Sequence, residues 1–250
     1  MVPPRFFAPE LTAASQEVIL PSSESTHLAR VLRLEDGAAV ELFDGRGMVR
    51  AGRVRRASPQ ASVVRVGAAL EAPPEPPATI VVAQALLKGD AMDAVIRDAT
   101  VLGAAEIWPM TAARSNVPTR AAVAAHERWE RVAVAAAKQC GRAVLPRIAG
   151  VRPLADVLAD VHADAPVRLW LTEPAASSGD SATLPVPPRG LCLAIGPEGG
   201  WTAAEVDAAR VAGWQAWTMA PVTLRAEHVT LAALSVIRYA WDDAARRRIT

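Results

Sequence analysis

The chain has 250 residues, 51% of them hydrophobic, and a formal net charge of +1 at pH 7, which by itself points to no class of partner. No apolar run reaches the roughly 20 residues that span a bilayer, and the first residues lack the apolar stretch of a signal peptide. We therefore expect a cytoplasmic protein that does not enter a membrane. Its two distant cysteines, Cys140 and Cys192, are expected to be free thiols.

Residues 1 to about 70 are predicted to be rich in β-structure. Short strands are expected at residues 18–20, 38–43, 48–54 and 62–66. A helical segment over residues 25–32 interrupts them, with Leu28, Val31 and Leu32 expected on one side. Several short strands at this spacing indicate a small barrel.

The charge of this region is one-sided. Between Arg46 and Arg65 there are six arginines and no acidic residue, and Arg5, Arg30 and Arg33 add to the set. The six are Arg46, Arg50, Arg53, Arg55, Arg56 and Arg65. Guanidinium groups suit bidentate contacts to phosphate and stacking on bases. We predict contact with RNA or DNA, the alternative being a solvated face balanced by nearby carboxylates.

A proline-rich segment over residues 71–78 is predicted to be an extended linker. Beyond it, strand and helix patterns alternate. Strands are expected at 79–86, 105–110, 167–171, 191–195 and 215–219, and helices at about 90–102, 126–139, 202–212 and 226–241. Asp90 is a candidate N-cap. Such alternation is typical of a mainly parallel sheet with helices on both faces.

The most informative stretch runs from Leu191 to Glu205. An apolar strand ends at Gly196-Pro-Glu-Gly-Gly200, and Thr202 with Glu205 forms the pattern of a capping box, so a helix should start there. A strand, a turn with bare backbone and a helix often form a ligand site at the carboxyl edge of a sheet. The alternative is an ordinary tight turn.

Three turns follow three consecutive predicted strands and should meet at one edge of the sheet. Each carries one glutamate: Glu173, Glu198 and Glu227. Carboxylates beside glycine backbone disfavour a phosphate ligand, and neither a P-loop nor a GxGxxG motif is present. A cationic or neutral ligand fits better, and S-adenosylmethionine, a sulfonium, is one candidate.

Other chemistries find little support. The four histidines show no metal-ligand spacing, so no metal is expected, and there is no GxSxG elbow. Cys140 is interpreted as a packing residue in a helix. His228 lies in a candidate site loop, although a histidine at a helix start is more often a solvated cap than a base.

Taken together, these motifs resemble the RsmE family, the bacterial 16S ribosomal RNA uracil-N3 methyltransferases of the SPOUT superfamily. The resemblance covers nearly the whole chain. Its residues are Arg5-Phe6-Phe7, His27 to Arg33, Lys88 to Asp93, Arg114-Ser115, Arg128-Trp129, Gln139 to Arg142, and Ile195 to Gly200. The glycine motif recurs among several SPOUT families, whereas its combination with the other segments is more specific.

The resemblance implies an α/β protein with a PUA-like RNA-binding β-barrel over residues 1–70, the linker 71–78 and a SPOUT methyltransferase domain over 79–250. That domain would hold a parallel sheet and a trefoil knot, bind S-adenosylmethionine through the knot loops, and act as a homodimer with active sites at the subunit interface. The implied substrate is 16S ribosomal RNA of the small subunit, methylated at N3 of a uridine.

The resemblance also assigns site residues. Arg225 would be catalytic, with Arg142, supplied from the partner subunit, and Glu227. The cofactor would contact Leu171, Thr172, Glu173, Ile195, Gly196, Pro197, Glu198, Gly199, Gly200, Met219, Pro221, Leu224 and Arg225. RNA would contact Arg5, Arg30, Arg33, Arg46, Arg53 and Arg55.

The segment Met219 to Val229 departs from the family pattern, which is close to Leu-Gly-x-Arg-Ile-Leu-Arg-Thr-Glu-Thr-Ala. Leu224, Arg225 and Glu227 match it, whereas the glycine, the first arginine and both threonines are replaced. Cofactor binding through backbone should tolerate these changes. Two alternatives therefore stay open: a SPOUT methyltransferase for another RNA or atom, such as a ribose 2′-hydroxyl, and a non-catalytic RNA-binding assembly factor.

Overall fold

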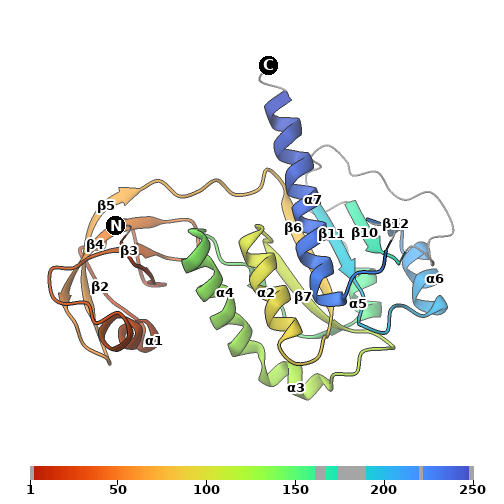
Figure 1. Ribbon diagram of the computed structural model, residues 1–250, viewed down its shortest axis with the longest axis horizontal. Helices are drawn as coiled ribbons and strands as arrows, with labels where there is room; N and C mark the ends of the chain where they lie inside the picture. The colour runs from red at the N-terminus through yellow and green to blue at the C-terminus, as the bar shows by residue number, and fades with distance from the viewer. Residues whose placement is uncertain (1–2, 161–166, 174–189, 220–221, 248–250) are drawn as a thin grey trace. The chain divides into compact units, whose positions relative to one another are not determined.

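The structure, a computed structural model, describes residues 3–160, 167–173, 190–219 and 222–247, with side chains up to Asp242. The chain divides into two compact units (Figure 1). Unit 1 comprises Met1–Glu75 and Ala137–Leu145, and unit 2 comprises Pro76–Ala136 and Pro146–Thr250.

Unit 1 is built on a curled five-stranded sheet in the order β1-β3-β4-β5-β2. The strands are β1 (Arg5–Phe7), β2 (Glu17–Ile19), β3 (Ala39–Phe43), β4 (Val49–Arg56) and β5 (Val63–Leu70). Only the β1–β3 pairing is parallel among these strands. The inner side chains, among them the fully buried Phe6, Leu42 and Val64, form one apolar core. The β-rich prediction is confirmed, although β1 was not among the predicted strands.

The helical segment of unit 1 corrects one prediction. It consists of α1 (Ser22–Thr26) and a π-helical turn, η1 (His27–Val31). Leu28 is buried, whereas Val31 is 64% and Leu32 40% exposed. A π-turn bonds residue i to i+5, here Leu32 N–H to the His27 carbonyl at 2.9 Å, and so has more residues per turn than an α-helix. This wider turn rotates Val31 away from the side that Leu28 buries.

Unit 2 contains a seven-stranded sheet in which every strand pairing is parallel. The order is β12-β10-β11-β6-β7-β8, and β9 also pairs with β7. The strands are β6 (Thr79–Ala85), β7 (Glu106–Thr111), β8 (Arg147–Ile148), β9 (Arg152–Pro153), β10 (Val167–Leu171), β11 (Gly190–Ile195) and β12 (Gln215–Trp217). Parallel strands buried on both faces read as continuous apolar runs, as β11 does.

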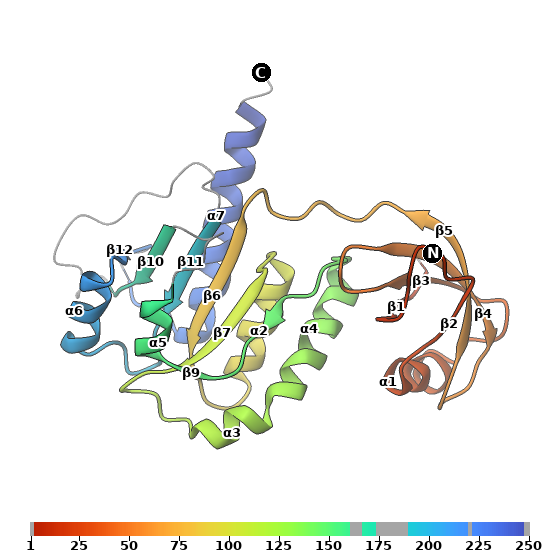
Figure 2. The same ribbon diagram turned by 180° about the vertical axis from the view of Figure 1, so that it is seen from behind.

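Helices cover both faces of this sheet, as Figures 1 and 2 show from opposite sides. Their bounds are α2 (Ala91–Val101), α3 (Thr119–Ala124), α4 (His126–Cys140), α5 (Leu154–Ala159), α6 (Ala203–Val211) and α7 (Ala226–Arg247). Residues of α2, α4 and α7 pack into the core on one face, and residues of α5 and α6 into the core on the other. None of the described helices is long and apolar enough to cross a membrane.

The alternation of strands and helices is therefore confirmed, with short additions. The helices α3 and α5 and the two-residue strands β8 and β9 were not predicted. Asp90 lies at the N-cap position of α2 but makes no side-chain capping bond, because its backbone is already helical (φ −79°, ψ −4°). The predicted N-cap position is therefore confirmed, whereas a capping hydrogen bond from the Asp90 side chain is absent.

Candidate active site

Three loops at the carboxyl edge of the unit 2 sheet surround one cavity of about 810 Å³. The strands that deliver them, β10, β11 and β12, are adjacent and parallel, so the predicted meeting of the three turns is confirmed. The lining residues are Leu171, Thr172, Glu173, Ile195 to Trp201, Met219, Val222 to Glu227, Lys88, Ala91, Arg114, Val206 and Val229. The volume lies in the range of about 300–1,000 Å³ that small-molecule sites occupy.

The glycine loop is shaped by an aromatic side chain. Trp201 stacks on Trp170 with ring centroids 3.9 Å apart, and its indole N–H donates to the Leu171 carbonyl at 2.9 Å. A Cβ at Gly196 would lie 3.0 Å from the Trp201 ring. A side chain at Gly196 would therefore press against Trp201, which joins the loop after β11 to the end of β10.

The second half of the loop also needs bare backbone. Gly200 has φ +66° and donates its N–H to the Pro197 carbonyl at 2.9 Å, which closes the turn. A Cβ at Gly199 would lie 3.0 Å from the Cβ of Arg114. The Arg114 guanidinium donates to the Gly199 carbonyl at 2.9 Å, so this side chain both covers and holds the loop.

Two carboxylates fix neighbouring segments to this loop. Glu198 accepts the backbone N–H of Lys88 at 3.1 Å, which connects the loops after β11 and β6. The predicted capping box of Thr202 and Glu205 is confirmed. Glu205 also accepts the Ala113 N–H at 2.7 Å and so ties the loop after β7 to the start of α6.

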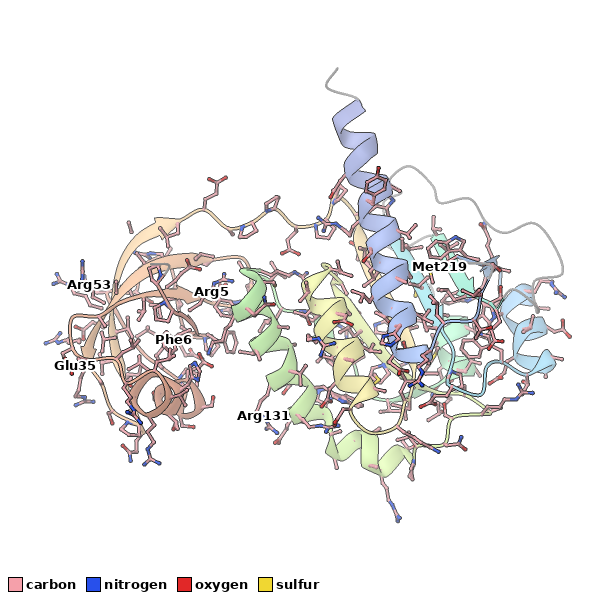
Figure 3. All side chains as sticks on the ribbon, viewed as in Figure 1. Arg5, Phe6, Glu35, Arg53, Arg131 and Met219 are labelled. Carbon is pink, nitrogen blue, oxygen red and sulfur yellow. The ribbon has the colours of Figure 1, made fainter. Side chains whose placement is uncertain are left out.

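The third loop leads from β12 into α7, and Met219 marks its start in Figure 3. Thr172 N–H donates to the Trp217 carbonyl at 3.1 Å, and the Thr172 and Thr218 hydroxyls lie 3.0 Å apart. The predicted residue Pro221 lies outside the described residues. Leu224 lines the cavity, and its contact with a cofactor stays a prediction.

The charged side chains of this third loop differ in exposure. The Arg225 side chain is 82% exposed and lies 3.9 Å from the Glu227 carboxylate, which is 24% exposed. Both residues line the cavity. His228 is exposed and does not line it.

The cavity wall carries both signs of charge. Its carboxylates are Glu173, Glu198 and Glu227, and its cations are Lys88, Arg114 and Arg225. Lys88 and Arg114 were not predicted as site residues, although both follow strands of the same sheet. Within the described ranges no cluster of three or more histidine, cysteine, aspartate or glutamate side chains has the arrangement of a metal site.

Arg142 belongs to unit 1 and is not among the residues that line the cavity. Its side chain is 8% exposed, and its Nη2 lies 2.6 Å from the Glu75 carboxylate. The single chain therefore gives this guanidinium a carboxylate partner inside unit 1. Its catalytic role stays a prediction.

The predicted RNA-contacting arginines fall into two groups. Arg5 is 8% exposed, pairs with Glu41 at 2.6 Å and lies 4.5 Å from the centre of the Phe43 ring. This burial corrects the prediction for Arg5, because a guanidinium enclosed in this way is not available to phosphate. Arg53, by contrast, projects from the sheet (Figure 3).

The other arginines of unit 1 are on its surface. Arg53 and Arg65 are direct cross-strand neighbours on β4 and β5, and Arg55 pairs with Glu17. Arg46 contacts Asp44 at 3.4 Å and the Pro9 carbonyl at 2.7 Å. Arg30 of η1 and Arg33, two residues beyond its end, are exposed, and their side chains make no hydrogen bond or ion pair with any described residue.

The two cysteines are free, as predicted. Burial in β11 raises the pKa of the Cys192 thiol to about 12, so this group is protonated at neutral pH. Cys140 is partly exposed.

Comparison with known proteins agrees with this architecture. The model of the RNA methyltransferase domain family matches residues 74–238, and that of the RNA methyltransferase PUA domain matches residues 20–66. The chain is 31% identical to the ribosomal RNA small subunit methyltransferase E of Mycobacterium bovis, over 98% of this chain and 96% of that protein. It is 34% identical to the protein of the same name from Bacillus subtilis, over 66% and 67% of the two chains.

Solved structures show the same similarity. The ribosomal RNA small subunit methyltransferase E of Neisseria gonorrhoeae, bound to S-adenosyl methionine, superimposes with a TM-score of 0.85 at 29% identity, covering 96% of this chain and 98% of that one. The putative methyltransferase Lpg2936 of Legionella pneumophila, also in complex with this cofactor, gives a TM-score of 0.88 at 28% identity, with the same coverage.

Proposed function

Since the chain belongs to the ribosomal RNA small subunit methyltransferase E family, we propose that it transfers a methyl group from S-adenosylmethionine to N3 of a uridine in 16S ribosomal RNA. The observation that carries this proposal is the three-loop cavity at the carboxyl edge of the unit 2 sheet.

The cavity residues suit this cofactor. Bare backbone at Gly196, Gly199 and Gly200 allows a ligand to approach closely and to bond main-chain groups. Leu171, Ile195 and Leu224 offer apolar contacts, and Glu173 and Glu227 would favour a sulfonium cation over an anion. The volume of about 810 Å³ accommodates a nucleoside with an amino-acid tail.

Bound S-adenosylmethionine supplies an electrophilic methyl group, and the chain must provide position and charge for the acceptor. Uracil N3 would give its proton to a water molecule and form the new bond to carbon as the carbon–sulfur bond breaks, so negative charge develops on the ring. Arg225, exposed at the cavity, would stabilise this charge, and Glu227, whose carboxylate lies 3.9 Å away, is its ion-pair partner. Holding both reactants in line supplies much of the rate.

We propose a homodimer with a trefoil knot in the SPOUT domain as the active form, in the cytoplasm. The proposed domains are residues 1–70, the linker 71–78 and residues 79–250. Arg142 from the partner subunit stays a second catalytic candidate, behind Arg225, because it is already bound to Glu75.

The RNA surface is proposed on the outer face of β4 and β5. Arg53 and Arg65 are direct cross-strand neighbours on this face, and Glu17 of β2, the neighbour of Arg65 on its other side, also pairs with Arg55. One carboxylate facing three arginines leaves a positive excess that a phosphate would neutralise. Arg30 and Arg33, which are exposed, and Arg46 and Arg55 would extend the surface.

The decisive experiment is mass mapping of ribosomal RNA modifications from a strain that lacks the protein. Loss of one N3-methyluridine from 16S RNA, restored by the wild-type gene, supports the proposal. Loss of a different mark would select another RNA or atom as the target, which the replaced residues of the 219–229 segment favour. Calorimetry with S-adenosylmethionine separates both from an assembly factor, which would not bind the cofactor.

The RNA surface has its own test. The double variant Arg53→Glu/Arg65→Glu should raise the dissociation constant for 16S RNA fragments and lower its salt dependence, because fewer counterions are released. The matched control Arg210→Glu reverses an exposed arginine of unit 2 that pairs with Asp207 and does not line the cavity. Equal affinities of the double variant and the wild type would exclude this face.

A further inference from the structure

Two polar side chains are buried in the apolar layer beside the glycine loop. Gln84 of β6 and Thr230 of α7 are both fully buried. Gln84 is in register with Ile195, so it adjoins Gly196, the first residue of the loop. Ile80 and Val82, which precede it by four and two positions on β6, belong to the apolar core under α2 and α7. A polar group at this position is unfavourable unless its hydrogen bonds are formed.

The Gln84 amide makes three hydrogen bonds. Its Nε2 donates to the Ala85 carbonyl at 3.0 Å and to the Gly196 carbonyl at 3.3 Å, and its Oε1 accepts from the Thr230 hydroxyl at 3.1 Å. Carbonyl oxygens can only accept, so the amide nitrogen must face them. This fixes the orientation of the amide, and Thr230 must then be the donor to its oxygen.

These bonds connect two walls of the cavity. Gly196 begins the middle wall, and Thr230 follows Val229 and Glu227, which line the third wall at the start of α7. Neither Gln84 nor Thr230 lines the cavity. Their effect on a ligand must therefore pass through the residues that they hold.

On the basis of the proposed function, we propose that Gln84 and Thr230 are positioning residues for cofactor binding. The amide sets the direction of the Gly196 carbonyl, and hence of the Gly196–Pro197 peptide that opens the loop. Through Thr230 it sets the start of α7, which carries Glu227 and follows Arg225. One buried amide thus holds the cofactor loop and the loop with the proposed catalytic cation at a fixed separation.

The test compares variants by calorimetry with S-adenosylmethionine and by thermal unfolding. Thr230→Val keeps the side-chain shape but removes the hydroxyl, which leaves the Gln84 Oε1 without its donor. We expect the dissociation constant to rise about tenfold, because one buried hydrogen bond is lost between the two walls. Thr230→Ser restores the donor and should bind like the wild type.

Thr100→Val is the matched control. Thr100 is a fully buried threonine whose hydroxyl donates to the Ile96 carbonyl within α2 at 2.7 Å, and it does not line the cavity. This variant should lower thermal stability about as much as Thr230→Val and leave the dissociation constant unchanged. If the two variants lose equal stability and both bind like the wild type, the positioning role is overturned.

The double variant Gln84→Met/Thr230→Val guards against loss of folding. Replacing both partners of a buried hydrogen bond by apolar groups is often nearly neutral for stability. The Gly196 carbonyl still loses its donor, so we expect about a tenfold weaker cofactor binding in a stably folded chain. Unchanged binding in this variant contradicts the inference. Absence of binding to the wild-type chain would overturn the proposed function itself, and the inference with it.

Discussion

The interiors of the two units are stabilised by different kinds of contact. In unit 1, ion pairs with little exposure join segments far apart in sequence: Lys138 with Glu24 at 2.8 Å, Arg142 with Glu75 at 2.6 Å and Arg5 with Glu41 at 2.6 Å. In unit 2, the two faces of the sheet are covered by apolar side chains, and buried polar groups such as Gln84 lie near the cavity. Ion pairs between distant segments thus contribute to the interior of unit 1, whereas the interior of unit 2 consists mainly of apolar contacts on the two faces of its sheet.

The largest effect should come from breaking an ion pair of unit 1. Glu24 is 9% and Lys138 17% exposed at the side chain, and Glu24 also accepts the Phe7 N–H at 3.1 Å. Glu24→Gln leaves the Lys138 charge without its partner, so the free energy of unfolding should fall by about 3 kcal/mol. Urea unfolding followed by circular dichroism measures this change.

The matched control is Glu17→Gln, which breaks the exposed pair with Arg55 in the same unit. An exposed pair contributes less than about 1 kcal/mol, so this change should be small. Equal losses of unfolding free energy in the two variants would show that the buried ion pair stabilises unit 1 no more than the exposed one does.

The next effect concerns Arg225, whose side chain is 82% exposed. Arg225→Ala should lower the rate of methyl transfer to small-subunit RNA about 100-fold, because a cation aimed at developing charge is lost. The free energy of unfolding should stay near the wild-type value. The affinity for S-adenosylmethionine should fall much less than the rate, because the cofactor is expected to be held mainly by loop backbone.

Arg210→Ala provides the control for this change, since Arg210 is an exposed arginine of α6 away from the cavity. Full methyl-transfer activity of Arg225→Ala would show that the Arg225 guanidinium does not stabilise the charge that develops on the base. A lower free energy of unfolding in Arg225→Ala would show that this guanidinium contributes to the stability of unit 2.

Gly196→Ala tests the apolar packing of unit 2 at the contact between Trp201 and the glycine loop. The added Cβ would lie 3.0 Å from the Trp201 ring, which is held against Trp170 and cannot easily move. We expect cofactor affinity to fall by about 2 kcal/mol, roughly 30-fold, from overpacking. Gly150→Ala is the control, because nothing lies within 4 Å of its added Cβ. Similar calorimetric affinities for both variants would contradict the role of the Trp201 contact.

The smallest effect is a pH dependence confined to unit 1. Burial, and then the charge of Lys138, lowers the pKa of His27 below its ordinary 6.5, while Glu24 acts in the opposite direction. The unfolded chain therefore binds this proton more readily than the folded chain. His27 contributes its full stability above about pH 6.5, and the contribution is lost as the pH falls towards the folded-state pKa.

The free energy of unfolding, measured with urea between about pH 8 and pH 5, should fall as the pH falls. This fall should be smaller in His27→Gln than in the wild type. The pH dependence of S-adenosylmethionine affinity should be the same in both proteins, since His27 belongs to unit 1 and the cavity to unit 2. If the unfolding free energy of the variant depends on pH as strongly as that of the wild type, the titration belongs to another group.

Much of the fold was predictable because its signals are local. The apolar run at Leu191–Ile195, the capping box of Thr202 with Glu205 and the glycines after β11 each fix a boundary through residues close in sequence. The joint position of the three cavity loops followed from the rule that parallel strands end at one edge. The structure departs from the predictions where backbone geometry differs from what was expected. Val31 is exposed because η1 is a π-turn, and the Asp90 side chain makes no capping bond because its backbone is already helical.

The site was harder to predict because its remaining residues depend on contacts across the chain. Arg5 looks like any surface arginine in sequence, and only the approach of β3 shows that Glu41 encloses it. Arg114 reaches Gly199 across 85 positions, and Gln84 reaches Thr230 across 146. The one local signal for Gln84, an amide within an apolar strand, becomes informative only when its partners are known.

Cys192 offers a way to time the opening of the sheet beside the cavity. Its thiol is 3% exposed in β11, and its pKa of about 12 keeps it protonated, so a thiol reagent can react only after that strand becomes accessible. Cys140, partly exposed in α4, provides an internal reference for reagent access. The labelling rate of Cys192 relative to Cys140 is thus a clock for local unfolding of the cofactor strand, and ligand binding should slow it.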